Sequence, residues 1–461
     1  MLARLQRFSR LFREKSKSGA LQIASGTALG QAIGFIALPV ISRLYNPGDI
    51  NELAAFTAIL SMTTAVASMR FDQSIPLAEN DDEAAVLYGV AKLGTVTTSL
   101  LSLAGFVIAF HYFNPPKNLP VLGSQPWLLG ACCLLTSFYL TSVMWGIRQT
   151  DYKEVAKTKV IQGVVGSVLQ LFGGFLHLGF FGLVSGQVLG QATAGTKLSA
   201  SVWKPLFRQA REGWAPFGRA VRKYKRFPLY LTPAALLNTA ALQLPALLVN
   251  LFFPMTQGGF YGWSMKIGQV PSGLIGTAIA QVFMGEASKR VRNGQGGITW
   301  LMDRSARTLA IAAVIYLALC LVVSLNMGLL FGAKWRDAGF SFAVLSVANA
   351  VSIVGSPLGM ALTVTGNQPT QLRFDMVRTP LVAMSVVAPH LLGWSFNATM
   401  ACLATVMSVT YVWYFKLARN SAVNHDRSVE AKTEVGEKAV STPYLDEEIL
   451  AAEEFGIEPT G

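Results

Sequence analysis

The sequence predicts an all-α integral membrane protein with about twelve transmembrane helices, arranged as two six-helix lobes. Three observations lead to this fold class. First, 52% of the 461 residues are hydrophobic and only 14% are charged, against about 25% charged in ordinary soluble domains. Second, the apolar residues fall in blocks of about 20 residues, the length that crosses about 30 Å of hydrocarbon. Third, the Leu-Pro segment 38–47 has a weak counterpart at 244–254, which suggests a duplication.

Twelve apolar blocks are long enough to be spanning helices. Gly and Pro recur inside them, as membrane helices tolerate when neighbouring groups satisfy the freed backbone. The eleventh block is the shortest and ends in Pro389 and His390. The expected spans are approximately residues 20–43, 52–71, 85–111, 121–147, 157–178, 180–202, 228–252, 260–283, 308–331, 340–364, 377–392 and 395–417.

Loop charges indicate the orientation of these spans, because Lys and Arg collect in loops that stay in the cytoplasm. With the N-terminus inside, the expected inner loops contain most of the basic residues, and both termini are cytoplasmic. The net charge of +13 is then a loop charge and not a sign of nucleic-acid binding. Arg373 and Arg378 count here as inner-loop charges. The outer loops contain little beyond Arg43, Lys117, Lys334 and Arg336.

The chain divides at its longest basic loop. Residues 20–203 form the first six-helix lobe, 204–227 a basic cytoplasmic linker and 228–417 the second lobe. Because six is even, both lobes start on the same side, which predicts parallel repeats. Residues 1–19 are basic and predict either an amphipathic segment on the cytoplasmic leaflet or a solvated tail. Residues 418–461 are polar and predict a disordered cytoplasmic tail.

Charges inside the expected spans are the first candidates for a functional site, since a charge within a bilayer is costly. Lys266 lies well inside the eighth span, where it either lines a cavity or extends to the outer interface along its long side chain. Arg43 ends the first span, and Arg70 with Asp72 closes the second. For each of these the alternative is a plain interfacial residue.

Amide side chains recur in the same helices and form the second set of candidates. They either bond neighbouring helices to one another or line a hydrated cavity. Together with the three cations they suit an anionic, sugar-bearing substrate, because Arg contacts phosphate oxygens through a planar fork of donors. The amides singled out are Gln31, Asn238, Gln243 and Gln269, with Gln187, Gln191, Asn250 and Gln281 as further members.

No cofactor or metal site is expected. Cys132 and Cys133 are adjacent, while Cys320 and Cys402 lie in other apolar blocks, so no C-x-x-C spacing occurs. The sequence also lacks a G-x-x-x-x-G-K-[ST] phosphate loop, which argues against an ATP-driven pump.

The opening helices resemble a known family. The stretch 25–31, the Leu-Pro pair at 38–39 and the segments 42–47 and 68–75 are similar to the first two helices of bacterial polysaccharide transporters. These are the Wzx-like flippases of lipid-linked oligosaccharides, which are related to the MATE exporters within the MOP superfamily. The specific matches lie mostly in the first 90 residues, and the second half matches only in pattern.

The resemblance implies two lobes that form a V around a central cavity and alternate between inward- and outward-facing states. The implied cargo is an undecaprenyl-diphosphate-linked repeat unit of O-antigen, capsule or exopolysaccharide, and the implied location is the bacterial inner membrane. A polysaccharide polymerase and a chain-length regulator are implied partners. Arg43, Arg70 and Lys266 would lie near the cavity. Asp72 and Asp375 are candidates for proton or sodium coupling, or else loop charges.

Two other functions stay open at this stage. A MATE-like multidrug or cation-coupled exporter would share the helix count, but it would need acidic residues on its cavity helices, where this chain has Lys266. A membrane polysaccharide polymerase would be expected to have a large outer loop, and the expected outer loops here are short.

Overall fold

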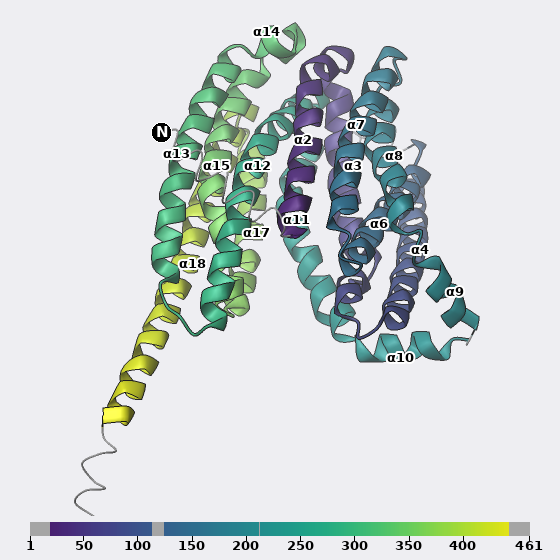
Figure 1. Ribbon diagram of the computed structural model, residues 1–461. Helices are drawn as coiled ribbons and strands as arrows, with labels where there is room; N and C mark the ends of the chain where they lie inside the picture. Colours follow the sequence, from purple (N-terminus) through teal and green to yellow (C-terminus); the bar gives the residue numbers. More distant parts are fainter. Residues whose placement is uncertain (1–18, 113–123, 212, 442–461) are drawn as a thin grey trace, which may run out of the picture.

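The structure, a computed structural model, describes residues 19–112, 124–211 and 213–441. Every regular element in these ranges is helical, and Figure 1 shows the long helices running side by side. The first group is α2 (Gly19–Leu44), α3 (Pro47–Ala67), α4 (Asp81–Tyr112), α6 (Trp127–Arg148), α7 (Tyr152–Phe175) and α8 (Phe180–Leu198). The second is α11 (Thr232–Phe252), α12 (Met255–Arg292), α13 (Ile298–Leu325), α15 (Ala338–Leu358), α17 (Gln368–Leu391) and α18 (Phe396–Ser441).

Nine helical segments in the described part of the chain are long and apolar enough to cross a membrane. They include every helix of the two groups except α7, α8 and α17. The predicted all-α membrane fold class is thereby confirmed, whereas the count of twelve crossings stays a prediction.

Close packing accounts for the many glycines of α7 and α8. A Cβ atom on Gly163 of α7 would lie 2.3 Å from the carbonyl oxygen of Gly30 in α2. A Cβ atom on Gly173 of α7 would lie 2.6 Å from Cα of Gly182 in α8. Small residues of this kind let membrane helices approach closely. The approach also brings the polar side chains of these three helices together.

The two groups form two lobes that meet at one end of the molecule. α11 packs on α3 of the first lobe and on α17, and α12 packs on α3 and on α15. At the top of Figure 1, the short helix α14 (Met327–Phe331) lies near the end of α2. We call this the α14 end. It also contains the 3-10 helix η3 (Ala333–Trp335).

The opposite end, which we call the linker end, contains the connection between the lobes. The expected linker 204–227 folds as two short helices, α9 (Trp203–Arg211) and α10 (Ala215–Lys223), followed by the π-helix η2 (Phe227–Leu231) that leads into α11. The short helix α16 (Ala361–Val364) connects α15 to α17.

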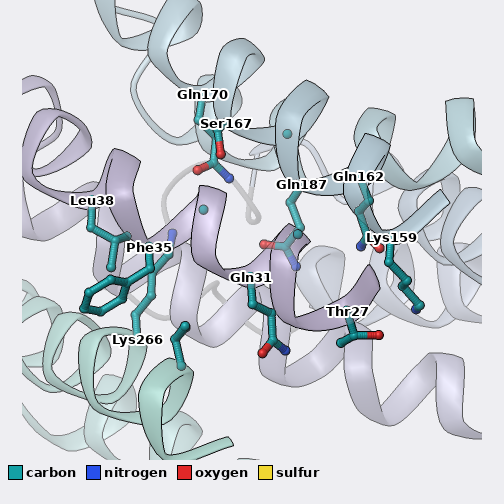
Figure 2. A pocket seen from close by; sticks show the side chains of 15 residues that line it. Thr27, Gln31, Phe35, Leu38, Lys159, Gln162, Ser167, Gln170, Gln187 and Lys266 are labelled. Atoms are coloured by element: carbon teal, nitrogen blue, oxygen red, sulfur yellow. The ribbon is translucent and has the colours of Figure 1, made fainter. Parts of the chain in front are cut away.

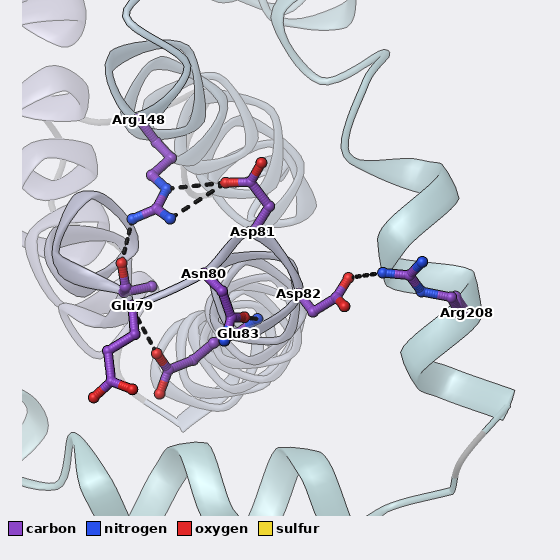
Figure 3. Close-up of polar contacts among 8 residues, drawn as sticks. Glu79, Asn80, Asp81, Asp82, Glu83, Arg148 and Arg208 are labelled. Carbon is purple, nitrogen blue, oxygen red and sulfur yellow. Dashed lines mark hydrogen bonds and ion pairs between the residues drawn. The ribbon is translucent and has the colours of Figure 1, made fainter.

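An acidic segment, residues 79–83, holds the linker helices against the first lobe, and Figure 3 shows its contact with Arg208 of α9. Its glutamates bond Lys223 of α10 at 2.7 Å each, and these hydrogen bonds raise the pKa of the Lys223 ammonium group. Single exposed ion pairs contribute little, but here four pairs gather around the start of α4, and two of them share Lys223. The pairs are Asp81–Arg148, Asp82–Arg208, Glu79–Lys223 and Glu83–Lys223.

The second helix ends earlier than the sequence suggested. α3 stops at Ala67, and Arg70 follows with a left-handed φ of 58° before the 3-10 helix η1 (Phe71–Leu77). Such a conformation costs a non-glycine residue on the order of 1 kcal/mol. Ser68 Oγ donates to Asp72 Oδ1 at 2.5 Å, and Asp72 is only 6% exposed. The turn therefore folds the Asp72 carboxyl group into the lobe.

The prediction of disorder from residue 418 is wrong as far as Ser441, because α18 continues to that residue. Arg419 donates to both carboxylate oxygens of Asp303 in α13 at 2.9 Å. Asp426 accepts hydrogen bonds from the backbone N–H groups of Ile298 and Thr299, at 3.0 and 2.9 Å. α18 thus caps the start of α13. Residues 442–461, and residues 1–18 of the expected basic segment, lie outside the described ranges.

We expect Asp426→Ala to destabilise the protein by about 1 kcal/mol, because two N–H groups at the start of α13 lose their acceptor. The midpoint of thermal unfolding in detergent should fall. Arg427→Ala is the matched control, since Arg427 is the next residue and its side chain is exposed. Equal midpoints for the two variants would contradict the capping role.

Candidate functional site

A cavity of about 370 Å³ lies between α2, α7 and α8 of the first lobe and α12 of the second. Figure 2 shows its amide side chains arranged around the axis of α2, with Lys266 extending from α12 toward Phe35. Amides both donate and accept hydrogen bonds, so this wall can bind phosphate oxygens and sugar hydroxyls. The polar lining residues are Thr27, Gln31, Lys159, Gln162, Ser167, Gln170, Gln187 and Lys266.

Lys266 also lines a second cavity, of about 270 Å³, between α3, α8, α11 and α12. It lies eleven residues after Met255, the first residue of α12, and so about 16 Å along the helix. Among the described residues the Lys266 ammonium group has no ion-pair or hydrogen-bond partner. An unpaired cation at this depth is costly unless a cavity hydrates it or a ligand neutralises it.

A third cavity, of about 880 Å³, extends into the second lobe between α11, α12, α15, α17 and α18. It shares Gln243, Tyr261 and Gln269 with the second cavity. The three cavities therefore adjoin one another through α11 and α12. We call them together the central cavity.

Arg378 lines the third cavity, although the sequence suggested an inner-loop charge. The reason is that α17 begins at Gln368, nine residues before the expected span, with Pro369 in its first turn. Pro is favoured there because its missing N–H is not needed. Arg378 consequently lies ten residues along α17 and is only 8% exposed.

A fourth cavity, of about 270 Å³, contains the other predicted pair, Arg70 and Asp72. The Nε atom of Arg70 is buried and has no hydrogen-bond partner among the residues that the structure describes. Lys92 of α4 is close enough to Asp72 for electrostatic interaction. Its ammonium group donates to the carbonyl oxygen of Phe138 at 2.8 Å and lies 3.4 Å from the centre of that ring.

The structure brings only part of the predicted set together. Gln31, Gln243, Gln269 and Lys266 line the central cavity. Asn238 is exposed and lines none of the four cavities described. Asp375 does not line them either; its carboxylate lies 4.0 Å from Nη1 of Arg378.

Arg43 lies at the α14 end, outside the cavities, where it joins the two lobes. Its guanidinium donates to the carbonyl oxygens of Pro39 and Leu329, at 2.8 and 3.2 Å. Lys334 donates to the Arg43 carbonyl oxygen at 3.1 Å. Burial lowers the pKa of Lys334, and Asp49 partly offsets this effect.

The indole of Trp335, which is fully buried, completes this contact by donating to the carbonyl oxygen of Ser42 at 2.9 Å. We call the set the α14 latch. It consists of Ser42, Arg43, Asn46, Leu329, Lys334 and Trp335.

Comparisons with known proteins agree with this architecture. An uncharacterized membrane protein in the cps region of Klebsiella pneumoniae is 20% identical over 400 residues, which cover 83% of this chain and 79% of that protein. An inward-facing multidrug resistance transporter of the MATE family, in the MOP superfamily, superposes with a TM-score of 0.68 at 11% identity, covering 89% and 98% of the two chains. The lipid II flippase MurJ, in an inward closed conformation, gives a TM-score of 0.64 at 8% identity over 90% and 92%.

These similarities to solved structures show that the chain has the fold of membrane transporters and flippases and crosses the membrane several times. The resemblance noted in the opening helices is also confirmed. Residues 40–339, well over half of the chain, match the family model described as polysaccharide biosynthesis protein. The chain therefore belongs to that family.

Proposed function

We propose that the protein is a non-enzymatic flippase that moves an undecaprenyl-diphosphate-linked oligosaccharide repeat unit across the bacterial inner membrane by alternating access. The observation that carries this proposal is the unpaired ammonium group of Lys266 in an amide-lined cavity between two lobes. Membership of a polysaccharide biosynthesis family supports the choice of a glycan cargo.

The cavity solves the problem that such a cargo poses. Each polar group moved into hydrocarbon without a partner costs several kcal/mol, so a diphosphate with sugars cannot cross unaided. Lys266 would neutralise part of the diphosphate charge, and Gln31, Gln187 and Gln269 would replace water around phosphate and sugar oxygens. The polyprenyl chain would stay in the lipid.

The charge of the lining favours an anionic cargo over the cationic drugs of a multidrug exporter. The charged side chains that line the central cavity are Lys159, Lys266 and Arg378. A cationic drug would be repelled by all three. The lining also favours transport over polymerisation. The described residues of the central cavity offer hydrogen-bonding and cationic groups but no pair of facing carboxylates.

Alternating access requires that the α14 latch open. The structure superposes better on an inward-facing MATE transporter, with a TM-score of 0.68, than on an outward-facing one, with a TM-score of 0.55. In this closed state the latch bonds join the two lobes at the α14 end. Asp72 and Asp375 stay our candidates for coupling the cycle to a proton or sodium gradient.

Lys266→Gln should reduce flipping about tenfold or more, because a hydrogen bond to a charged group contributes about 1.5–3 kcal/mol. The measurement is the movement of a labelled lipid-linked oligosaccharide across proteoliposomes. Lys289→Gln is the control on the same helix, since Lys289 is exposed in the last turn of α12. Unchanged flipping by Lys266→Gln, or wild-type proteoliposomes that move cationic dyes instead, would reject the proposal.

Trp335→Phe should shift the protein toward a state open at the α14 end by about fivefold, the effect of one lost hydrogen bond of about 1 kcal/mol. Spin labels at the exposed positions Leu178 and Leu325, in a cysteine-free background, would report the distance between the lobes. Trp394→Phe is the control, because Trp394 is exposed and outside the latch. Identical distance distributions for both variants would show that the latch does not hold this end closed.

Twelve crossings would return the chain to its starting side, whereas nine would not, so topology tests the span count. We expect alkaline phosphatase fused after Ser441 to be inactive, as a cytoplasmic enzyme, and the same enzyme fused after Gly332 to be active. Active enzyme at Ser441 would exclude twelve crossings with both termini inside.

A further inference from the structure

We infer that the third cavity is a separate subsite for the sugar part of the cargo, and that Arg378 recognises a carboxylate on an acidic sugar there. The inference rests on the proposed function, because it names the class of glycan that this flippase would carry. It assigns a role to a residue that lies away from the first cavity and from Lys266.

The guanidinium of Arg378 has N–H donors that its neighbours in the structure do not fully use. Arg378 is 8% exposed, and within the described ranges its buried Nε atom has no hydrogen-bond partner. Nη2 donates to the Tyr411 hydroxyl at 3.4 Å, and Nη1 lies 4.0 Å from the Asp375 carboxylate. Both contacts are long for hydrogen bonds of a charged group. Most of the five N–H donors of the guanidinium therefore stay available.

Aromatic rings hold this guanidinium in place. Its central carbon lies 5.1 Å from the centre of the Tyr411 ring and 5.9 Å from that of Phe374. Phe374 is itself packed against Tyr414 and Trp413, with ring centres 4.7 and 5.0 Å away. A planar fork held by rings is pre-organised for bidentate binding of a carboxylate.

A second buried donor lines the same cavity. Asn349 is 5% exposed, and its Nδ2 atom has no hydrogen-bond partner in the part of the chain that the structure describes. Leaving a buried donor unpaired is costly, and a ligand oxygen would satisfy it. Gln243, Gln269 and Ser352 add further hydrogen-bonding groups to the lining. The cavity thus offers one carboxylate fork and several partners for hydroxyl groups.

The surroundings favour a sugar carboxylate over the diphosphate of the lipid carrier. Asp375, at 4.0 Å from Arg378, offsets part of the local positive charge, and it would repel a multiply charged diphosphate more strongly than a single carboxylate. The described residues that line the two cavities around Lys266 include no Asp or Glu. The third cavity, at 880 Å³, is also larger than the first and second, at 370 and 270 Å³, which suits several sugar rings.

The test compares the binding of three probes to the purified full-length protein in nanodiscs. The probes are cellobiouronic acid, its neutral counterpart cellobiose, and inorganic pyrophosphate. We expect the wild type to bind cellobiouronic acid about tenfold more tightly than cellobiose, because only the acidic sugar can make a bidentate, charge-assisted contact with Arg378. Arg378→Gln should remove this preference and leave pyrophosphate binding unchanged. Lys266→Gln should weaken pyrophosphate binding and keep the sugar preference.

Arg373→Gln is the matched control, because Arg373 lies on the same helix and is exposed. If Arg378→Gln elutes as an aggregate, Arg378→Lys carries the test: it keeps the charge, loses the fork, and should still lose most of the preference. Equal binding of the two disaccharides by the wild type would overturn the inference. Loss of pyrophosphate binding in Arg378→Gln would also overturn it, by assigning the site to the carrier phosphate.

Failure of the proposed flippase function would give a different result from failure of this inference. The wild type would then not flip any lipid-linked oligosaccharide in proteoliposomes, while the preference for cellobiouronic acid and its dependence on Arg378 would persist.

Discussion

The cost of an unpaired polar group inside a membrane is the constraint on which this structure depends. It requires helices, which satisfy the backbone internally, and it requires every intramembrane cation to have either a partner or access to a hydrated space. Lys92 has a partner, since its ammonium group bonds a backbone carbonyl and faces an aromatic ring. Lys266 and Arg378 instead line cavities, and among the described residues Nε of Arg378 has no hydrogen-bond partner. This difference separates structural cations from candidate binding groups.

The same constraint links the packing of the first lobe to the proposed site. Glycines bring α2, α7 and α8 into close contact, which leaves little room for apolar side chains between them. The polar side chains on these helices then gather on the remaining face, toward α12 of the second lobe. The close packing of α2, α7 and α8 and the amide-rich wall of the first cavity thus involve the same three helices.

The sequence was sufficient for the features that depend on composition and spacing. The apolar blocks, together with Lys266, Gln31, Gln243 and Gln269, could be predicted because they lie well inside their helices, whereas Asn238 of α11 lines none of the four cavities described. Arg378 could not, because the apolar window placed the start of its helix too late. Asn367 followed by Pro369 was the available signal, since a capping residue and an early Pro mark a helix start. Arg43 is placed by contacts with a segment nearly 300 residues away, which no local pattern shows.

The ion pairs of the acidic segment 79–83 have a mechanical consequence. They tie both α9 and α10 to the first lobe, through Arg208 and Lys223, so most of the chain between the lobes moves with the first one. If the lobes rock as proposed, the pivot would be confined to the few residues of the π-helix Phe227–Leu231 before α11. π-Helices are rare and are frequently found at functional sites. Most of the connection between the lobes is therefore bonded to the first lobe, and only the short segment before α11 is left to change conformation.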